Sequence, residues 1–167
     1  MTVRHTTPAD YRQIQEIYAY ARTQMRRTGN PGQWGDDRPT GETLLSDIHN
    51  RQSHVIEERG QIFGVFTFII GEDATYRIIE AGQWLNDAPY GTIHRIAGCT
   101  AGKGIFRECL AYCSSQISNI RIDTHRDNAV MQHLLEKYGF QKCGIIYVED
   151  GSPRIAYQRC LCGASLR

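Results

Sequence analysis

Apolar residues along this 167-residue chain recur at strand spacing and at helix spacing in turn. Residues 3–6 predict a short strand, and the residues after them predict a helix that Thr7 caps and Pro8 opens. Four apolar residues at positions i, i+3, i+4 and i+7 give this helix one buried face: Ile14, Ile17, Tyr18 and Ala21. We expect the helix to end near residues 28–31, where Gly and Pro interrupt the pattern.

A loop over residues 29–41 follows, rich in Gly and Pro, and it contains Trp34. Beyond the loop the pattern predicts a short second helix, whose inward residues are Leu44, Leu45 and Ile48. Alternating apolar positions then predict two antiparallel strands at residues 54–58 and 61–70. Residues 76–85 have a less definite pattern and precede the central strand.

The pattern next predicts a central strand at residues 92–97, a helix that starts near Ile105 and a strand at residues 120–125. A further helix opens at Asn128 and has the apolar face Met131, Leu134, Leu135 and Tyr138. Gly139 supplies a left-handed cap, so this helix should stop at Tyr138.

A hairpin completes the series, with strands at residues 143–148 and 154–159 turned at Asp150-Gly151. The chain has no repeat and no low-complexity linker, so we expect one domain over residues 1–167, with residues 159–167 as a mobile tail.

Composition narrows the class of protein. The chain is 41% hydrophobic and 22% charged with a net charge of +1, which gives no reason to expect nucleic acid or a membrane surface as a partner. No apolar run approaches the ~20 residues of a membrane span. The polar start at residues 1–5 does not resemble a signal peptide. We therefore expect a cytoplasmic protein.

The six cysteines do not form a Cys-x-x-Cys pair, so neither a zinc site nor a disulfide framework is predicted. Cys109 and Cys113 fall on the apolar side of their helix and are interpreted as small buried hydrophobes. Cys160 and Cys162 lie in the expected tail, where they are liable to oxidation.

The chemistry of the chain centres on residues 100–105, a glycine-containing loop between the central strand and a helix. Glycines allow close approach of a ligand to the backbone, and the free N–H groups of a helix start attract anions, so a phosphate or pyrophosphate is the expected guest. The loop is not a P-loop, because only three residues lie between Gly98 and Gly102 where that motif has four, and Gly104 follows Lys103 where it has Ser or Thr. It is not a dinucleotide fingerprint either, because Arg107 stands at the third glycine position. A plain flexible turn is the alternative reading of this motif.

Two motifs in order resemble the GNAT N-acetyltransferase superfamily. Gly102 and Gly104 match the glycines of its pyrophosphate loop, Gln/Arg-x-x-Gly-x-Gly/Ala, although Cys99 replaces Gln or Arg. Residues 128–140 resemble the second half of its signature, in which Asn opens a helix and Gly-Phe closes it. The resemblance implies an α/β (α+β) fold with a mixed, mostly antiparallel central sheet of six to seven strands and about four flanking helices. It also implies acetyl-CoA as cosubstrate.

The resemblance assigns cofactor-binding roles along the chain. Backbone groups of Ile96, Ala97 and Gly98 would pair with the pantetheine arm and the thioester. The loop residues that would hold the pyrophosphate are Gly102, Lys103, Gly104 and Ile105. Asn128 resembles the family asparagine that contacts the cofactor arm, and it is equally readable as a helix N-cap.

The acid and the base are less clear from the sequence. Many members of the superfamily have a Tyr four residues before the Gly of Gly-Phe, where Leu135 stands in this chain, so a dedicated acid for the leaving thiolate is in doubt. Tyr138 lies on the same face and is interpreted as core. His94 is the first candidate for the base, because histidine exchanges protons near neutral pH, and Glu80 is the second.

Four further side chains have candidate roles near the site. Trp34 is assigned to the acceptor pocket and Trp84 to the core. Asp123 and His125 suggest a metal pair, but the sequence supplies no remaining ligands, so no metal site is predicted.

The expected function is transfer of acetyl from acetyl-CoA to a primary amine by direct attack in a ternary complex. The expected partner is a small-molecule or peptide amine acceptor, and a homodimer is left open. Two alternatives remain, a non-catalytic acyl-CoA-binding or sensing module and a protein-interaction domain that kept the fold without the cofactor.

Overall fold

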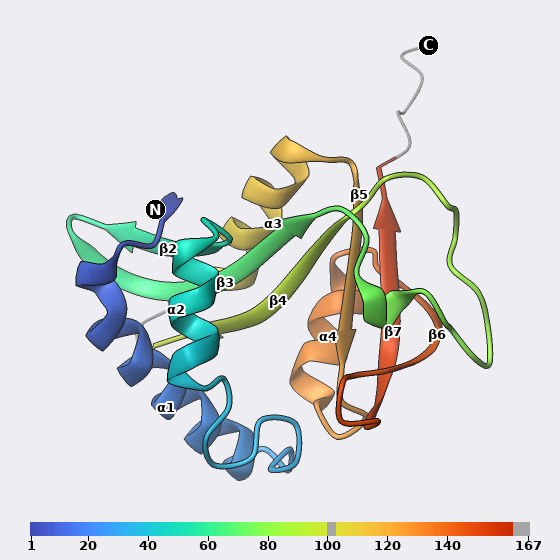
Figure 1. Cartoon of the computed structure of the whole chain (residues 1–167), viewed down its shortest axis with the longest axis horizontal. Coiled ribbons are helices and arrows are strands. Elements are labelled where there is room, and N and C mark those ends of the chain that lie inside the picture. The colour runs from blue at the N-terminus through green and yellow to red at the C-terminus, as the bar shows by residue number, and fades with distance from the viewer. Residues whose placement is uncertain (100–102, 162–167) are drawn as a thin grey trace.

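Seven strands form one mixed sheet in the order β1-β2-β3-β4-β5-β7-β6 (Figure 1). The computed structural model describes residues 1–99 and 103–161. The strands are β1 Thr2–His5, β2 Ser53–Glu58, β3 Gln61–Ile70, β4 Gly91–Gly98, β5 Asn119–Thr124, β6 Gln141–Tyr147 and β7 Pro153–Cys160. Neighbouring strands run antiparallel except β4 and β5, which are parallel.

Four α-helices cover the two faces of the sheet, α1 and α2 on one face and α3 and α4 on the other (Figure 1). They span α1 Tyr11–Arg27, α2 Gly41–His49, α3 Ile105–Gln116 and α4 Ala129–Lys137, with short 3-10 turns η1 Pro8–Asp10 and η2 Ala74–Tyr76. Strand alternation divides the core, since Val55 and Val65 face α1 and α2 while Ile56 and Phe66 face α3. The predicted fold class is confirmed. None of the helices described is long and apolar enough to cross a membrane.

Most predicted elements are present, including the end of α4. Tyr138 is its C-cap, and the N–H groups of Gly139 and Phe140 donate to the carbonyl oxygens of Glu136 and Leu135, which is a Schellman cap. Cys109 and Cys113 are free thiols in the core, as expected.

Residues 76–85, for which the sequence predicts no definite element, contain one isolated bridge between Glu80 and Ile145. Two predicted details are wrong. Leu45 was expected inward, but it is 50% exposed, because the inner face of α2 carries the polar Asp47 together with Leu44 and Ile48. The last strand, β7, continues through Cys160, two residues into the segment expected to be a tail. Residues 162–167 of that segment lie outside the described residues.

The strands β4 and β5 separate after a short contact. They pair only at Gly91 with Ile120 and at Thr92 with Arg121, and Figure 1 shows them diverging from there. The β4 edge beyond Thr92 therefore faces a wedge-shaped opening in the sheet with no strand beside it.

A bulge in β4 faces this opening. The β3–β4 register shifts between Val65 and Thr67, and Arg95 has a φ of 51°, a left-handed conformation that is rare for a residue with a side chain. The Tyr18 hydroxyl donates to the Arg95 carbonyl oxygen at 2.7 Å. This hydrogen bond ties Arg95 to α1, and an ion pair ties it to α2.

The ion pair joins Arg95 to Asp47 of α2. Nε and Nη2 of Arg95 donate to the two carboxylate oxygens at 2.9 Å each, and the Thr67 hydroxyl donates to Asp47 at 2.8 Å. Asp47 is buried, so its charge depends on these donors. The ion pair thus holds the β4 bulge against α2.

We expect Asp47→Asn to lower the free energy of unfolding by about 2–4 kcal/mol, because the substitution leaves the Arg95 cation without its anion. Urea denaturation followed by circular dichroism measures the change. Asp36→Asn is the matched control, since that carboxylate also pairs with an arginine but is 96% exposed. Equal midpoints for Asp47→Asn and wild type would show that the ion pair does not hold the bulge.

Candidate functional site

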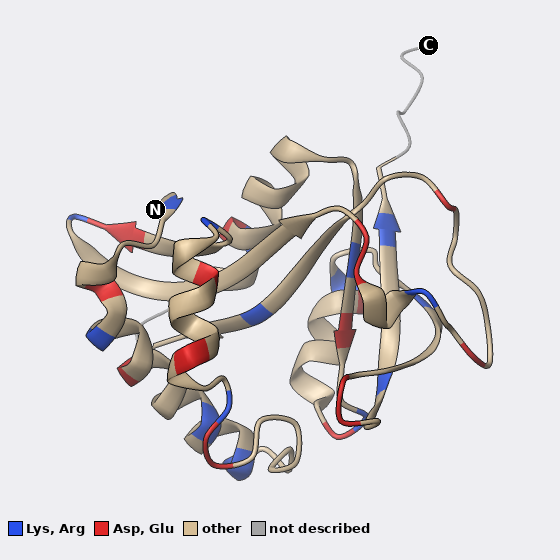
Figure 2. Cartoon of the chain, viewed as in Figure 1, with Lys and Arg blue, Asp and Glu red and all other residues tan. Residues whose placement is uncertain are grey.

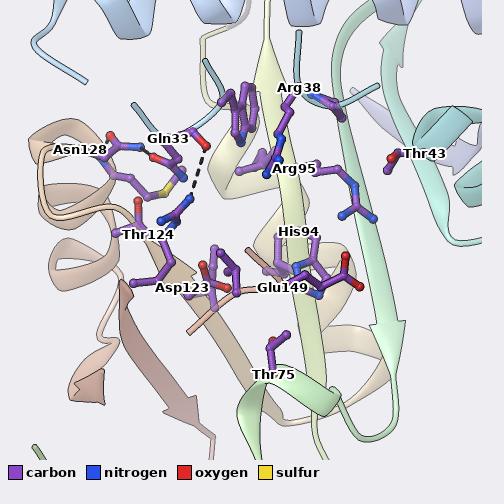
Figure 3. A pocket seen from close by; sticks show the side chains of 18 of the residues that line it. Gln33, Arg38, Thr43, Thr75, His94, Arg95, Asp123, Thr124, Asn128 and Glu149 are labelled. Atoms are coloured by element: carbon purple, nitrogen blue, oxygen red, sulfur yellow. Dashed lines mark hydrogen bonds between the residues drawn. The ribbon is translucent and has the colours of Figure 1, made fainter. Parts of the chain in front are cut away.

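The opening between β4 and β5 contains a pocket of about 850 Å³ (Figure 3). Its walls come from the α1–α2 loop, β4, β5, the start of α4 and the β6–β7 loop. Charged residues of both signs line it: Arg38, Asp73, Arg95, Asp123, Glu149, Asp150 and Arg154. Figure 2 shows acidic and basic residues interspersed over the rest of the chain as well, which agrees with the net charge of +1.

A second pocket of about 420 Å³ lies at the other end of β4, between the first turn of α3 and one side of α4. Predicted cofactor residues line it: Ile96, Ala97, Gly98, Gly104 and Ile105. Ile96 and Met131 line both pockets, so the two cavities adjoin at these side chains.

The glycine positions at the second pocket have steric reasons. Gly104 is the N-cap of α3 with a φ of 79°, which disfavours any residue with a side chain. A Cβ on Gly98 would approach Ile105 Cγ1 to 3.2 Å. Lys103 is exposed and is not among the described residues that line either pocket. Gly102 lies outside the described residues.

Asn128 is the N-cap of α4, as one of its two readings predicted. Its Oδ1 accepts from the Met131 N–H at 3.0 Å, and its Nδ2 donates to Oε1 of Gln33 at 2.9 Å. Asn128 lines the larger pocket, and through Gln33 it joins α4 to the α1–α2 loop (Figure 3). Its predicted contact with a cofactor arm stays a prediction.

His94 lies on β4 in the wall of the larger pocket, and its Nε2 is 2.9 Å from Oδ2 of Asp73. The pKa of Asp73 is lowered to about 2: burial alone would raise it, but hydrogen bonds from His94 and Thr75 outweigh burial. Asp73 is therefore a carboxylate at neutral pH and can only accept, so His94 Nε2 carries the proton in the neutral ring. Nδ1 is then the basic nitrogen, and it has no hydrogen-bond partner among the described residues.

Asp73 was missed by the sequence analysis. It lies in the β3–β4 loop, 21 residues before His94, and no local motif links the two. The signal that could have located it is the Asp-x-Thr sequence of a 3-10 turn, since Asp73 accepts from both the N–H and the hydroxyl of Thr75.

The second base candidate, Glu80, is in a different place. Its backbone pairs with Ile145 of β6, and its carboxylate accepts from the exposed Tyr147 hydroxyl at 2.8 Å. It is not among the described residues that line the larger pocket. The structure thus brings His94 to the pocket and does not bring Glu80 there.

The two tryptophans lie in different places, and the acceptor role of Trp34 stays a prediction. Trp34 lines the larger pocket and also packs edge-on against Tyr18, with ring centroids 5.6 Å apart. Trp84 belongs to the core, where it packs on Tyr76 and donates to the Tyr76 carbonyl oxygen at 2.9 Å. The guanidinium of the buried Arg121 stacks on this ring, 4.1 Å from the ring centroid.

Asp123 and His125, weighed as a metal pair, have separate partners. Asp123 Oδ1 accepts from the Tyr76 hydroxyl at 2.7 Å, and His125 Nδ1 accepts from the Asp127 N–H at 3.1 Å.

Leu135, which stands at the position of the family tyrosine, and Tyr138 differ in exposure. Leu135 is fully buried in the core, while Tyr138 lines the smaller pocket and packs on Phe106 with ring centroids 5.3 Å apart. The Tyr138 hydroxyl has no hydrogen bond to another described residue, so nothing in this part of the chain orients it as a proton donor.

Three solved structures are similar to this chain over nearly its whole length. A GNAT-family acetyltransferase of Streptococcus agalactiae is 32% identical, with 95% of this chain and 94% of that chain covered and a TM-score of 0.85. A GNAT-family acetyltransferase of Listeria monocytogenes is 22% identical, with 96% and 94% covered and a TM-score of 0.68. The protein yncA of Salmonella typhimurium, solved with its cofactor acetyl-CoA, is 19% identical, with 98% and 95% covered and a TM-score of 0.62. No protein-family model and no curated protein matches the sequence.

The mixed sheet with its flanking helices is the fold that these structures share with the chain. The chain belongs to the GNAT family of acetyltransferases. The resemblance carried by the glycine loop and the Asn to Gly-Phe segment is thereby confirmed at the level of the family.

Proposed function

We propose that this protein is an N-acetyltransferase that moves acetyl from acetyl-CoA directly to a primary amine in a ternary complex. The observation that carries the proposal is the meeting of two pockets at Ile96 and Met131 on the unpaired edge of β4. One pocket is bounded by glycines and a helix start, and the other holds an oriented histidine. Two reactants that enter from opposite ends would meet beside β4.

The smaller pocket fits the acyl donor. A pantetheine arm carries amide groups, and the free N–H and C=O groups of β4 at Ile96 to Gly98 can pair with it as an added strand would. The first turn of α3 after Gly104 offers unpaired N–H groups to a pyrophosphate. The acetyl-CoA bound in the yncA structure supports this choice of donor.

The larger pocket would take the acceptor, with His94 as the base. An alkylammonium group has a pKa of roughly 10 and must lose a proton before its nitrogen can attack. His94 Nδ1 takes this proton, and Asp73 stabilises the imidazolium that results. Asp73 acts through His94 and is a positioning residue.

The acyl transfer at the thioester carbonyl requires no further catalytic side chain. The amine nitrogen bonds to the carbonyl carbon and loses its second proton to water, the C–S bond breaks, and the sulfur leaves as a thiolate that takes a proton from water. A thiol has a reference pKa of about 8.5, so its thiolate is a fair leaving group without a dedicated acid. The burial of Leu135, at the position of the family tyrosine, agrees with a mechanism that lacks this acid.

The proposal is tested by calorimetry with acetyl-CoA followed by an assay of CoA thiol release over a panel of amines. Binding and turnover together support the proposed enzyme. Binding without turnover for every amine would indicate the non-catalytic acyl-CoA-binding module instead.

Gly104→Val should abolish detectable CoA binding, because a side chain there blocks the backbone approach of the pyrophosphate. Gly60→Val is the matched control: Gly60 has nearly the same φ, 78°, and no atom within 4 Å of a built Cβ, but it lies in the β2–β3 turn. Both variants carry similar backbone strain, so thermal melting should show similar losses of stability. Calorimetry that finds wild-type affinity in a folded Gly104→Val protein would overturn the loop assignment.

Tyr138→Phe should leave kcat within about three-fold of wild type, because we assign the Tyr138 ring a packing role on Phe106. A general acid would contribute on the order of a hundred-fold or more. Tyr147→Phe serves as the control, since this phenol is exposed on β6 and bonds only to Glu80 among the described residues. A hundred-fold loss confined to Tyr138→Phe would make Tyr138 the acid.

His94→Ala should lower kcat/KM on the order of a hundred-fold at neutral pH and remove the acid limb of its pH profile. The deficit should shrink as the pH rises toward the pKa of the amine, because free amine then forms without a base. Asp73→Asn should retain the limb with a loss of about tenfold, since the amide no longer holds the ring by a charge.

His133→Ala is the control for this series, because His133 is an exposed histidine on α4. Should His94→Ala keep the wild-type limb at wild-type rates, the base lies elsewhere, and Glu80→Gln is the next variant to measure.

A further inference from the structure

Arg154, near the start of β7, places a buried positive charge in the wall of the larger pocket. It is 7% exposed, its Nη1 donates to the Pro153 carbonyl oxygen at 3.0 Å, and its Nη2 donates to the Gln33 carbonyl oxygen at 3.4 Å. Both acceptors are neutral. Within residues 1–99 and 103–161, no carboxylate forms an ion pair with Arg154, although a guanidinium withdrawn from water ordinarily needs one.

Most other charged groups of the pocket already have partners of their own. These pairs are His94 with Asp73, Arg95 with Asp47, and Arg38 with Asp150. The charge of Arg154 also attracts the Asp150 carboxylate, but Asp150 is exposed and forms its ion pair with Arg38, at 3.3 Å. Arg154 is therefore the buried cation of this wall that the described chain leaves without a direct anion.

Thr124 supplies a second, independent sign of a missing partner. It lines the same pocket at the end of β5, it is fully buried, and its hydroxyl has no hydrogen-bond partner among the described residues. Thr124 and Arg154 both line this pocket, at adjoining ends of the paired strands β5 and β7. A buried hydroxyl left unsatisfied costs about 1–3 kcal/mol, so a ligand that accepts its proton in a hydrogen bond would gain affinity.

The surroundings of Arg154 agree with an uncompensated cation. The pKa of His125 is lowered, first by burial and then by the Arg154 charge. Figure 3 shows Thr124 near Gln33 and Asn128, at one side of the pocket.

We propose that Arg154 and Thr124 bind the carboxylate of the acceptor, which makes the substrate a small amino-carboxylic acid rather than a simple amine. The inference rests on the proposed N-acetyltransferase function. The guanidinium can donate two parallel N–H groups to a carboxylate, and the hydroxyl can donate a third hydrogen bond. Glu149, an exposed acid of the same pocket without an ion pair among the described residues, favours the ammonium end of such a substrate.

The test compares three free amino acids, glycine, leucine and phenylalanine, with their carboxamides at saturating acetyl-CoA. We expect at least one free acid to exceed its amide in kcat/KM by about 30-fold or more, although an amide substituent makes the amine easier to deprotonate. A carboxamide also imitates the start of a peptide, so a preference for the amides would overturn the proposal in favour of a peptide N-terminus.

Variants of the two residues separate binding from structure. Arg154→Gln should lower kcat/KM for the preferred acid about 30-fold and for its amide less than about three-fold, and Arg154→Lys should restore part of the loss. Thr124→Val should lower kcat/KM for the acid about five-fold without lowering the melting temperature, because it removes an unsatisfied hydroxyl. Arg126→Gln is the control, since it removes an equal charge from a side chain that is 82% exposed.

Equal losses for acid and amide in Arg154→Gln would assign this residue a structural role and overturn the proposal. If no acceptor of any kind is acetylated, the proposed N-acetyltransferase function fails, and the carboxylate site is then judged by binding alone. Calorimetry of N-acetyl-leucine with the full chain and CoA should show affinity at least tenfold higher for wild type than for Arg154→Gln. Equal affinities would overturn the carboxylate site as well.

Discussion

The separation of β4 from β5 is the constraint on which the rest of the structure depends. Two parallel strands that stay paired would close the sheet and satisfy their own backbone groups, as they do at Gly91 and Thr92. Beyond Thr92 the bulge at Arg95 turns β4 away, and the chain holds that turn with Tyr18 from α1 and Asp47 from α2. The helices on one face of the sheet therefore keep open a gap that both pockets use.

This arrangement explains why a buried ion pair is present where apolar residues would suffice for packing. Asp47 and Arg95 add little net stability over a hydrophobic pair, because desolvation offsets their attraction. The two parallel hydrogen bonds, however, fix the orientation of the Arg95 side chain and so favour the left-handed conformation of its backbone. The Thr67 hydroxyl of β3 holds the carboxylate in place. The polar contacts thus select the shape of β4 more than they stabilise the domain.

The sequence allowed the helices and most strands to be predicted, because each depends on neighbours within a few residues. Capping by Asn128 and termination at Gly139 are of this kind. The site depends on contacts between distant residues: His94 meets Asp73 across a loop of irregular structure, and Tyr18 reaches Arg95 from 77 residues away. The spacing of apolar residues along the sequence does not predict such contacts. Leu45 was placed inward for the same reason: the inward position on α2 is occupied by Asp47, whose partner Arg95 lies on the distant strand β4.

The two pockets differ in what builds them, and this difference bears on how specificity arises. The smaller pocket is made by β4 and two helices, so its shape follows from the core of the fold. The larger one is closed by the α1–α2 and β6–β7 loops, which Gln33 holds in place through its side-chain contact with Asn128 and its backbone contact with Arg154. If the larger pocket takes the acceptor, as we propose, a change in either loop can alter which acceptor fits without disturbing β4 or α3. Gln33 nevertheless ties the wall of this pocket to the N-cap of α4, so the two loops are anchored to a helix that also lines the smaller pocket.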